Sequence, residues 1–152
     1  MKNTNTAEHR IDDIFELHRF IISIFIKDFE EVFTLPEGLN FTHVRAVLIL
    51  RFHGVMAMSE LSGRLALEKG SFTPVATALI TRGYVRKEQS AEDRRVYNLA
   101  LTGEGTSLAD RFKKEHGTFI SGVLDRLEPE ERKEYFDLVF RLNEYNRKIK
   151  GQ

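Results

Sequence analysis

The chain of 152 residues contains no cysteine, no tryptophan and only three prolines. Without cysteine it has no disulfide, no thiolate metal site and no thiol redox switch. No apolar run approaches the roughly 18 residues that a membrane-spanning helix needs. The polar and acidic start, MKNTNTAEHRIDD, does not have the pattern of a signal peptide. These absences predict a cytoplasmic protein that has no membrane partner.

Motifs of the common enzyme classes are also missing. The sequence contains no G-x-x-x-x-G-K-[ST], no H-E-x-x-H and no G-x-S-x-G. The adjacent acids Asp12 and Asp13 point about 100° apart on a helix, which suits solvation rather than catalysis. None of the five histidines is paired at the four-residue spacing of a helical metal site. We therefore expect no enzymatic activity, no metal and no other cofactor.

Charges of the two signs are balanced, at 23 each, but they are unevenly distributed. Residues 59–102 carry seven basic and five acidic side chains, whereas residues 1–35 carry four and seven. The central region is therefore modestly basic. If that region binds nucleic acid, phosphate contacts predict moderate affinity that falls as salt rises.

Apolar residues recur at three- and four-residue spacing over several stretches, which predicts a mainly helical fold. The expected helices cover residues 11–33, 41–52, 103–127 and 129–149. Asn40 or Thr42 is the cap of the second, and Thr102 is the cap of the third. The first helix, rich in phenylalanine and isoleucine, is apolar on more than one face. It suits either an ordinary core position or packing against a second copy of the chain.

The region 59–105 has a different pattern. A short helix capped by Ser59 is followed by a turn at Lys69-Gly70. A second helix follows over residues 72–82, with Ser71 as its predicted N-cap. Two strand-like runs follow, at residues 84–88 and 96–101, and the tip between them holds two adjacent arginines. Helix, turn, helix and basic-tipped hairpin are the outline of a winged helix-turn-helix. The predicted fold class is therefore mainly α with a small β-hairpin wing (α+β).

The tip and its surroundings resemble a known protein family. Asp93-Arg94-Arg95, followed by Leu101-Thr102 and Gly105, is similar to the wing signature of the MarR family of bacterial transcription regulators, and residues 81–85 (TRGYV) resemble its helix-to-strand junction. The resemblance covers nearly the whole chain. It implies a single domain, 1–152, in which residues 41–102 bind DNA and residues 8–35 and 103–150 form a helical dimerisation part. The implied partners are a palindromic double-stranded operator and a second copy of the chain.

Candidate DNA-binding residues follow from this outline. The second helix of the motif would present hydroxyls and methyls to base edges or phosphates, from Ser71, Thr73, Pro74 and Thr77; the alternative is that these are plain solvent-facing residues. In the family, the position of Pro74 is often basic or polar. Candidates for phosphate contacts are Arg64, Arg82, Arg86 and Lys87. The candidates for the contact between the wing and DNA are Arg94 and Arg95, since a guanidinium suits a narrow minor groove. By resemblance, Arg95 enters that groove and Asp93 holds the tip.

The resemblance also implies a small aromatic or anionic ligand between the dimerisation layer and the winged unit. Residues that could line such a pocket are aromatic or histidine side chains: Phe15, His18, Phe52, His53, Phe112 and His116. The plainer interpretation of the histidines is that they are packed or interface residues. For the whole protein we predict a ligand-responsive repressor that binds DNA as a homodimer. The alternative is a winged-helix dimer that acts as a protein-interaction module with little DNA binding.

Overall fold

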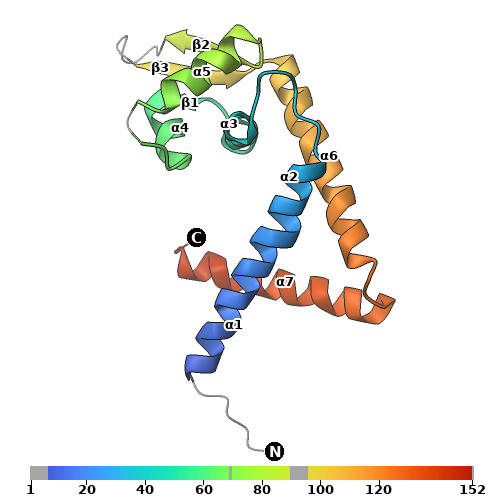
Figure 1. Cartoon of the computed structure of the whole chain (residues 1–152). Helices are drawn as coiled ribbons and strands as arrows, with labels where there is room; N and C mark the ends of the chain where they lie inside the picture. Colours follow the sequence, from blue (N-terminus) through green and yellow to red (C-terminus); the bar gives the residue numbers. More distant parts are fainter. Residues whose placement is uncertain (1–6, 69, 90–95, 152) are drawn as a thin grey trace, which may run out of the picture. The chain divides into compact units, whose positions relative to one another are not determined.

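The computed structural model describes residues 7–68, 70–89 and 96–151. The chain divides into two compact units, residues 1–115 and 116–152, and each is described by itself. The elements, drawn in Figure 1, are α1 (Ala7–Phe20), η1 (Ile21–Lys27), α2 (Asp28–Val32), α3 (Phe41–His53), β1 (Met56–Ala57), α4 (Met58–Arg64), α5 (Phe72–Thr81), β2 (Val85–Gln89), β3 (Tyr97–Leu101), α6 (Gly103–Leu124) and α7 (Pro129–Ile149). Helix α6 crosses the division between the units. In the described part of the chain, none of the helices combines the length and the apolar character of a membrane span.

The first helical stretch runs without a break from Ala7 to Val32, as the periodicity predicts, but its middle is not an α-helix. Residues Ile21–Lys27 form a π-helix, in which each backbone bond spans five residues instead of four. That winding brings side chains five apart alongside each other. Phe20 and Phe25 accordingly meet edge to face, with ring centroids 5.7 Å apart.

An aromatic cluster anchors the end of this stretch to α6. Phe29 and Phe33 are buried, and the ring centroid of Phe112 lies 5.2 Å from Phe29 and 5.0 Å from Phe33. Arg111 covers the cluster, because its guanidinium lies 4.6 Å from the centroid of Phe33 and donates to the carbonyl oxygen of Thr34 at 3.1 Å. The N-terminal helix is thereby fixed at its C-terminal end.

Helix α3 begins with a reciprocal cap at Asn40. The Oδ1 atom of Asn40 accepts from the backbone N–H of Thr42 at 3.0 Å and of His43 at 3.3 Å, and Nδ1 of His43 accepts from the backbone N–H of Asn40 at 3.1 Å. Of the two predicted caps, the structure selects Asn40. The helix ends at Gly54, whose φ of +79° suits a residue without a Cβ.

The periodicity of residues 41–52 predicts Val44, Val47 and Phe52 on the inner face of α3; Val44 and Val47 are buried, but Phe52 is 69% exposed. At about 100° per residue, Phe52 lies roughly 140° around the helix from Val47 and 160° from the buried Leu50. Its ring therefore points away from the core.

A three-stranded antiparallel sheet in the order β1-β3-β2 completes the winged unit. The third strand, β1, is a two-residue segment that the sequence presented only as a connection; Met56 pairs with Leu99. Helix α4 follows directly, with Ala57 at its N-cap, so the predicted cap at Ser59 is wrong. Strand β3 is the middle strand and buries both Leu99 and Ala100, rather than alternating strictly.

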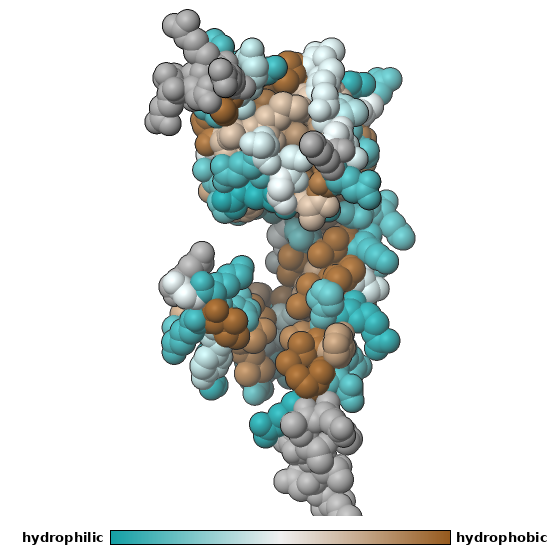
Figure 2. Space-filling view, turned by 90° about the vertical axis from the view of Figure 1, so that its left-hand side faces the viewer, coloured by the Kyte–Doolittle hydropathy of each residue, from teal (hydrophilic) through white to brown (hydrophobic). Residues whose placement is uncertain are grey.

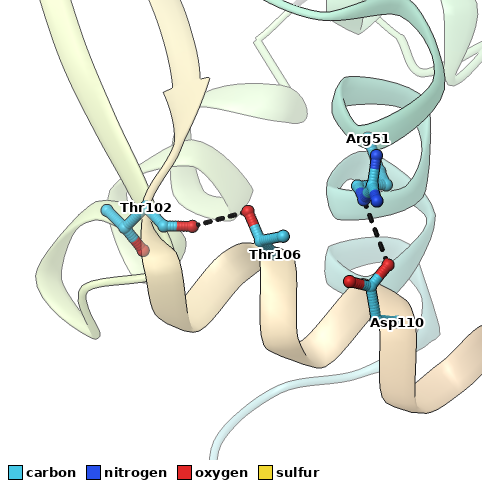
Figure 3. Close-up of polar contacts among 4 residues, drawn as sticks. All are labelled: Arg51, Thr102, Thr106 and Asp110. Atoms are coloured by element: carbon cyan, nitrogen blue, oxygen red, sulfur yellow. Dashed lines mark hydrogen bonds and ion pairs between the residues drawn. The ribbon is translucent and has the colours of Figure 1, made fainter.

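Helix α6 starts where the sheet ends (Figure 3). Thr102 is its cap, as predicted, because Oγ1 accepts from the backbone N–H of Gly105 at 3.1 Å. The Oγ1 of Thr106 donates to the carbonyl oxygen of Thr102 at 2.9 Å, and further along Asp110 pairs with Arg51 of α3 at 3.1 Å. These contacts fix the first half of α6 against the winged unit.

The second unit consists of the rest of α6 and α7. Pro129 is in the first turn of α7, and Glu131 accepts from the backbone N–H of Glu128 at 3.0 Å, which completes the predicted acidic helix start. Arg132 pairs with Asp125 across the connection at 2.5 Å. Burial raises the pKa of Tyr135.

Candidate nucleic-acid interface

Helix α5, the second helix of the helix-turn-helix, has a buried face and an open face. Phe72, Ala76 and Leu79 are buried in the winged unit. On the open side, Thr73, Pro74 and Thr77 are exposed, as the sequence predicts. The helix thus presents a row of small side chains to the outside.

Ser71 occupies the N-cap position of α5, but its side chain makes no capping bond. Its backbone is helical, with φ of −69° and ψ of −18°, whereas a capping serine adopts an extended conformation. The predicted capping role of Ser71 is therefore wrong. Its side chain is exposed at the N-terminal end of the helix.

All four basic residues predicted to contact phosphate are exposed, and all four have partners within the chain. Arg64 pairs with Glu60 at 3.0 Å, and Arg86 pairs with Glu88 and donates to the carbonyl oxygen of Leu101. Exposed pairs of this kind contribute only about 0–1 kcal/mol. Arg64 and Arg86 can therefore exchange their internal partners for a phosphate at little cost.

Lys87 of β2 contacts the ring of Tyr97 on β3. Its Nζ atom is 3.7 Å from the ring centroid of Tyr97, which is 41% exposed on the neighbouring strand. The contact holds the ammonium group close to the sheet surface.

Arg82 has a role that the sequence did not reveal. Its Nε donates to the carbonyl oxygen of Glu37 at 3.3 Å, and its guanidinium lies where a side chain on Gly38 would be. Gly38 has a φ of +72°, which is why the turn favours glycine, whereas the Arg82 guanidinium could move aside for a side chain there. Arg82 therefore ties the C-terminal end of α5 to the loop before α3.

His43 lies beside this tie. Only 8% of its surface is exposed, and burial followed by the charge of Arg82 lowers its pKa, against an opposing effect of its hydrogen bond with Asn40. The neutral imidazole is thus the form that caps α3. Nothing in the local sequence signals the contact, because Arg82 and Glu37 are 45 positions apart.

The wing strands are paired from Val85↔Leu101 to Gln89↔Tyr97. This register directs both strands toward residues 90–95. The predicted wing residues Asp93, Arg94 and Arg95 lie outside the described residues, so their roles remain predictions.

The residues predicted to line a ligand pocket have different surroundings. Phe15 and His18 line an open hollow along the N-terminal helix, whereas Phe112 is packed in the aromatic cluster with Phe29 and Phe33. Phe52 is exposed near the end of α3. His53 follows it, and the Nε2 of His53 lies 3.3 Å from a guanidinium nitrogen of Arg64. His116 belongs to the second unit.

Metal-binding side chains do not converge in the part of the chain that the structure describes. No group of three or more His, Asp or Glu residues there is arranged to hold a metal ion.

Comparisons with known proteins agree with this architecture. The MarR family model matches residues 39–97, which contain the helix-turn-helix and most of the hairpin. The HTH-type transcriptional regulator YwhA of Bacillus subtilis is 22% identical over 109 residues, covering 72% of this chain and 78% of YwhA.

Solved structures show the same fold over most of the chain. The transcriptional regulator Tm0710 of Thermotoga maritima matches with a TM-score of 0.72 and 19% identity, over 95% of this chain and 99% of that one. FabT of Streptococcus pneumoniae, solved in complex with DNA, matches with a TM-score of 0.64 and 19% identity, over 93% and 99% of the two chains. Residues 39–97, which hold the helix-turn-helix and most of the hairpin, thus match the MarR family of transcription regulators, and the chain around them is similar in sequence to regulators of that kind.

Proposed function

We propose that the protein is a ligand-responsive repressor that binds a palindromic operator as a homodimer. The observation that carries the DNA-binding part is the open face of α5, which is exposed over a buried core within the segment that the MarR family model matches. A single winged helix reads few base pairs. Two copies related by a two-fold axis double the contacts and suit half-sites about one helical turn apart.

The homodimer is supported by apolar surface that the chain leaves uncovered. Helix α7 has 21 residues, and none of them is buried. It nevertheless exposes seven large apolar side chains, of which Phe140 is 61% exposed and Ile149 82% exposed. Helix α1 adds exposed side chains such as Ile14 and Phe15, and patches of this kind are brown in Figure 2. An isolated α7 would be marginal in water, so a second copy of the chain is the occupant we propose.

The oligomeric state is testable with a matched pair of variants on α7. The wild type should scatter light as a species of twice the chain mass, and Phe140→Asp should shift it toward the monomer by burying a charge in the interface. Asn146→Asp adds the same charge on the same helix at a polar, exposed position about 120° around the helix from Phe140, and should leave the dimer intact. A monomeric wild type at micromolar concentration would contradict the proposal.

DNA recognition is tested by selecting bound sequences from a random duplex pool at near-physiological salt. An enriched palindrome with half-sites about one helical turn apart supports the operator that we propose. Repression follows if that site overlaps a promoter and the protein lowers transcription from it in a purified system.

A ligand response is proposed from Phe15 and His18, which are exposed and line the same open hollow. The expected ligand is a small aromatic acid, because the ring and the imidazole offer stacking and a charge-sensitive donor. Calorimetry at millimolar concentration should detect binding that Phe15→Ala weakens. Absence of any heat change or any effect on DNA affinity would remove the ligand from the proposal.

One observation favours the interaction module as a second candidate. Arg64, Arg82, Arg86 and Lys87 all have partners within the chain. If these partners are retained, few phosphates are neutralised and DNA affinity barely depends on salt. A regulator that exchanges them for phosphates must lose affinity steeply between about 50 and 200 mM salt. The slope of affinity against salt therefore separates the two.

A further inference from the structure

The open face of α5 is unusual in the chemistry that it offers. Thr73, Pro74, Thr77 and Thr81 are its exposed residues, and Ser71 is exposed at its N-cap. None of the ten residues of the helix is charged, and none carries a side-chain amide. The groups available to a DNA base are thus hydroxyls, methyls and one pyrrolidine ring.

This chemistry excludes most of the base-specific contacts of the major groove. Guanine is recognised by a bidentate arginine or lysine, adenine by asparagine or glutamine, and cytosine by a carboxylate. None of these side chains belongs to α5, and Arg82 just beyond its end is held by the carbonyl oxygen of Glu37. A hydroxyl bonds to several bases and discriminates little. The remaining specific partner is the C5-methyl group of thymine.

The spacing of the apolar groups suits that partner. Thr73 and Thr77 are four residues apart, and Pro74 and Thr77 are three apart, so all three lie on one face of the helix. Pro74 also has no backbone N–H, which removes from the first turn one donor that could otherwise hold a phosphate. The result is a short, weakly polar strip along the exposed side of the helix.

We propose that α5 selects its half-site chiefly through the C5-methyl groups of thymines, which pack against Thr73, Pro74 and Thr77. The inference rests on the proposed binding of duplex DNA, and it names what that site reads. Thr77 is a specificity-determining residue through its methyl group rather than through its hydroxyl.

The size of the effect follows from the area of one methyl group. Burying one carbon of this kind strengthens binding about fourfold. A bidentate contact with a purine would discriminate by roughly 5- to 150-fold instead. Recognition through methyls is therefore shallow at each position and needs several thymines in each half-site.

The test uses the duplex that selection from the random pool enriches. Each thymine is replaced in turn by deoxyuridine, which pairs with adenine in the same way but lacks the C5-methyl group. We expect an affinity loss of about fourfold at two or three thymines in each half-site, and no change at thymines in the flanks. An enriched site that tolerates every replacement would overturn the inference while leaving DNA binding in place.

A matched pair of variants at Thr77 assigns the contact to the protein group. Thr77→Val keeps a methyl at the same position and removes the hydroxyl, whereas Thr77→Ser does the reverse; both fit an exposed helix position. Thr77→Val should retain affinity and sensitivity to deoxyuridine. Thr77→Ser should bind about fourfold more weakly and lose its sensitivity to one replacement. The opposite pattern would mean that the hydroxyl reads the base and would overturn the inference.

The selection step separates this inference from the function on which it rests. A pool that yields no enriched sequence from a folded dimer refutes both. An enriched sequence in which the half-sites contain no thymine refutes the methyl contact alone.

Discussion

Gly105 is the position where one added carbon should most clearly damage the winged unit. It lies in the first turn of α6, directly against Tyr84, the residue before strand β2. A Cβ atom there would be 2.1 Å from the backbone carbonyl oxygen of Tyr84 and 3.0 Å from a methyl group of Leu101. Because the closest atom belongs to the backbone, no rotamer change can relieve the overlap. Gly105→Ala must therefore push the start of α6 away from the sheet.

The expected loss is the balance of three effects. Overpacking in a tight core costs about 1–3 kcal/mol. The displacement also weakens the hydrogen bond from the backbone N–H of Thr102 to the carbonyl of Tyr84, which is 3.1 Å long and contributes about 0.5–1.5 kcal/mol. Alanine regains about 0.5–1 kcal/mol as a better helix former. We expect a net loss of about 0.5–4 kcal/mol, centred near 2 kcal/mol, in the free energy of unfolding.

Urea denaturation followed by circular dichroism measures this loss, with all variants at one protein concentration because the proposed dimer would make stability depend on concentration. The matched control is Gly103→Ala, two residues earlier in the same turn, where an added Cβ meets no atom within 4 Å. It should be neutral or stabilising by up to about 1 kcal/mol. If Gly105→Ala were within about 0.5 kcal/mol of the wild type, the close approach of α6 to Tyr84 would be refuted.

Three further predictions concern single side chains. Because the fold lowers the pKa of His43, the unfolded chain takes up a proton first as pH falls below the ordinary value of 6.5. The wild type should thus lose stability between about pH 7 and 5. In urea titrations at both pH values, His43→Gln, which retains a capping-box residue, should lose less stability than the wild type. Equal losses would exclude His43 as the cause. Arg95→Ala should weaken operator binding by roughly 1–3 kcal/mol if the wing enters a groove, and an unchanged affinity at two salt concentrations would remove that role. Arg51→Ala should change stability by less than about 1 kcal/mol in urea, since its pair with Asp110 is exposed; a larger loss would show that the pair is more than a surface contact.

Local signals made much of the fold predictable. Asn40, Thr102 and Pro129 mark helix starts through chemistry that acts within a few residues, and the structure confirms all three. The wing strands were also within one residue of their predicted bounds, because Gly83 and the polar tip delimit them.

Contacts between distant parts of the chain were not predictable. The partner of Arg82 is a backbone carbonyl 45 residues earlier, and no periodicity signals it. Strand β1 has two residues, too few to show an alternating pattern, and it exists only because β3 pairs with it. The exposed side of α5 was found from the sequence, because Leu79 and Phe72 fix the buried side of the same helix.

The π-helical stretch Ile21–Lys27 is also a position where the chain can lose one residue without breaking the helix. Each of its turns holds one residue more than an α-turn, as if a single residue had been inserted into a continuous helix. Removing one residue there would restore α-helical winding without breaking the backbone ladder. Because seven residues of π-helix turn the chain by about as much as six of α-helix, residues Ala7–Phe20 would keep nearly the same orientation about the helix axis. Related chains that differ by one residue at this position would share the same winged unit and keep the same stripe of the N-terminal helix outward.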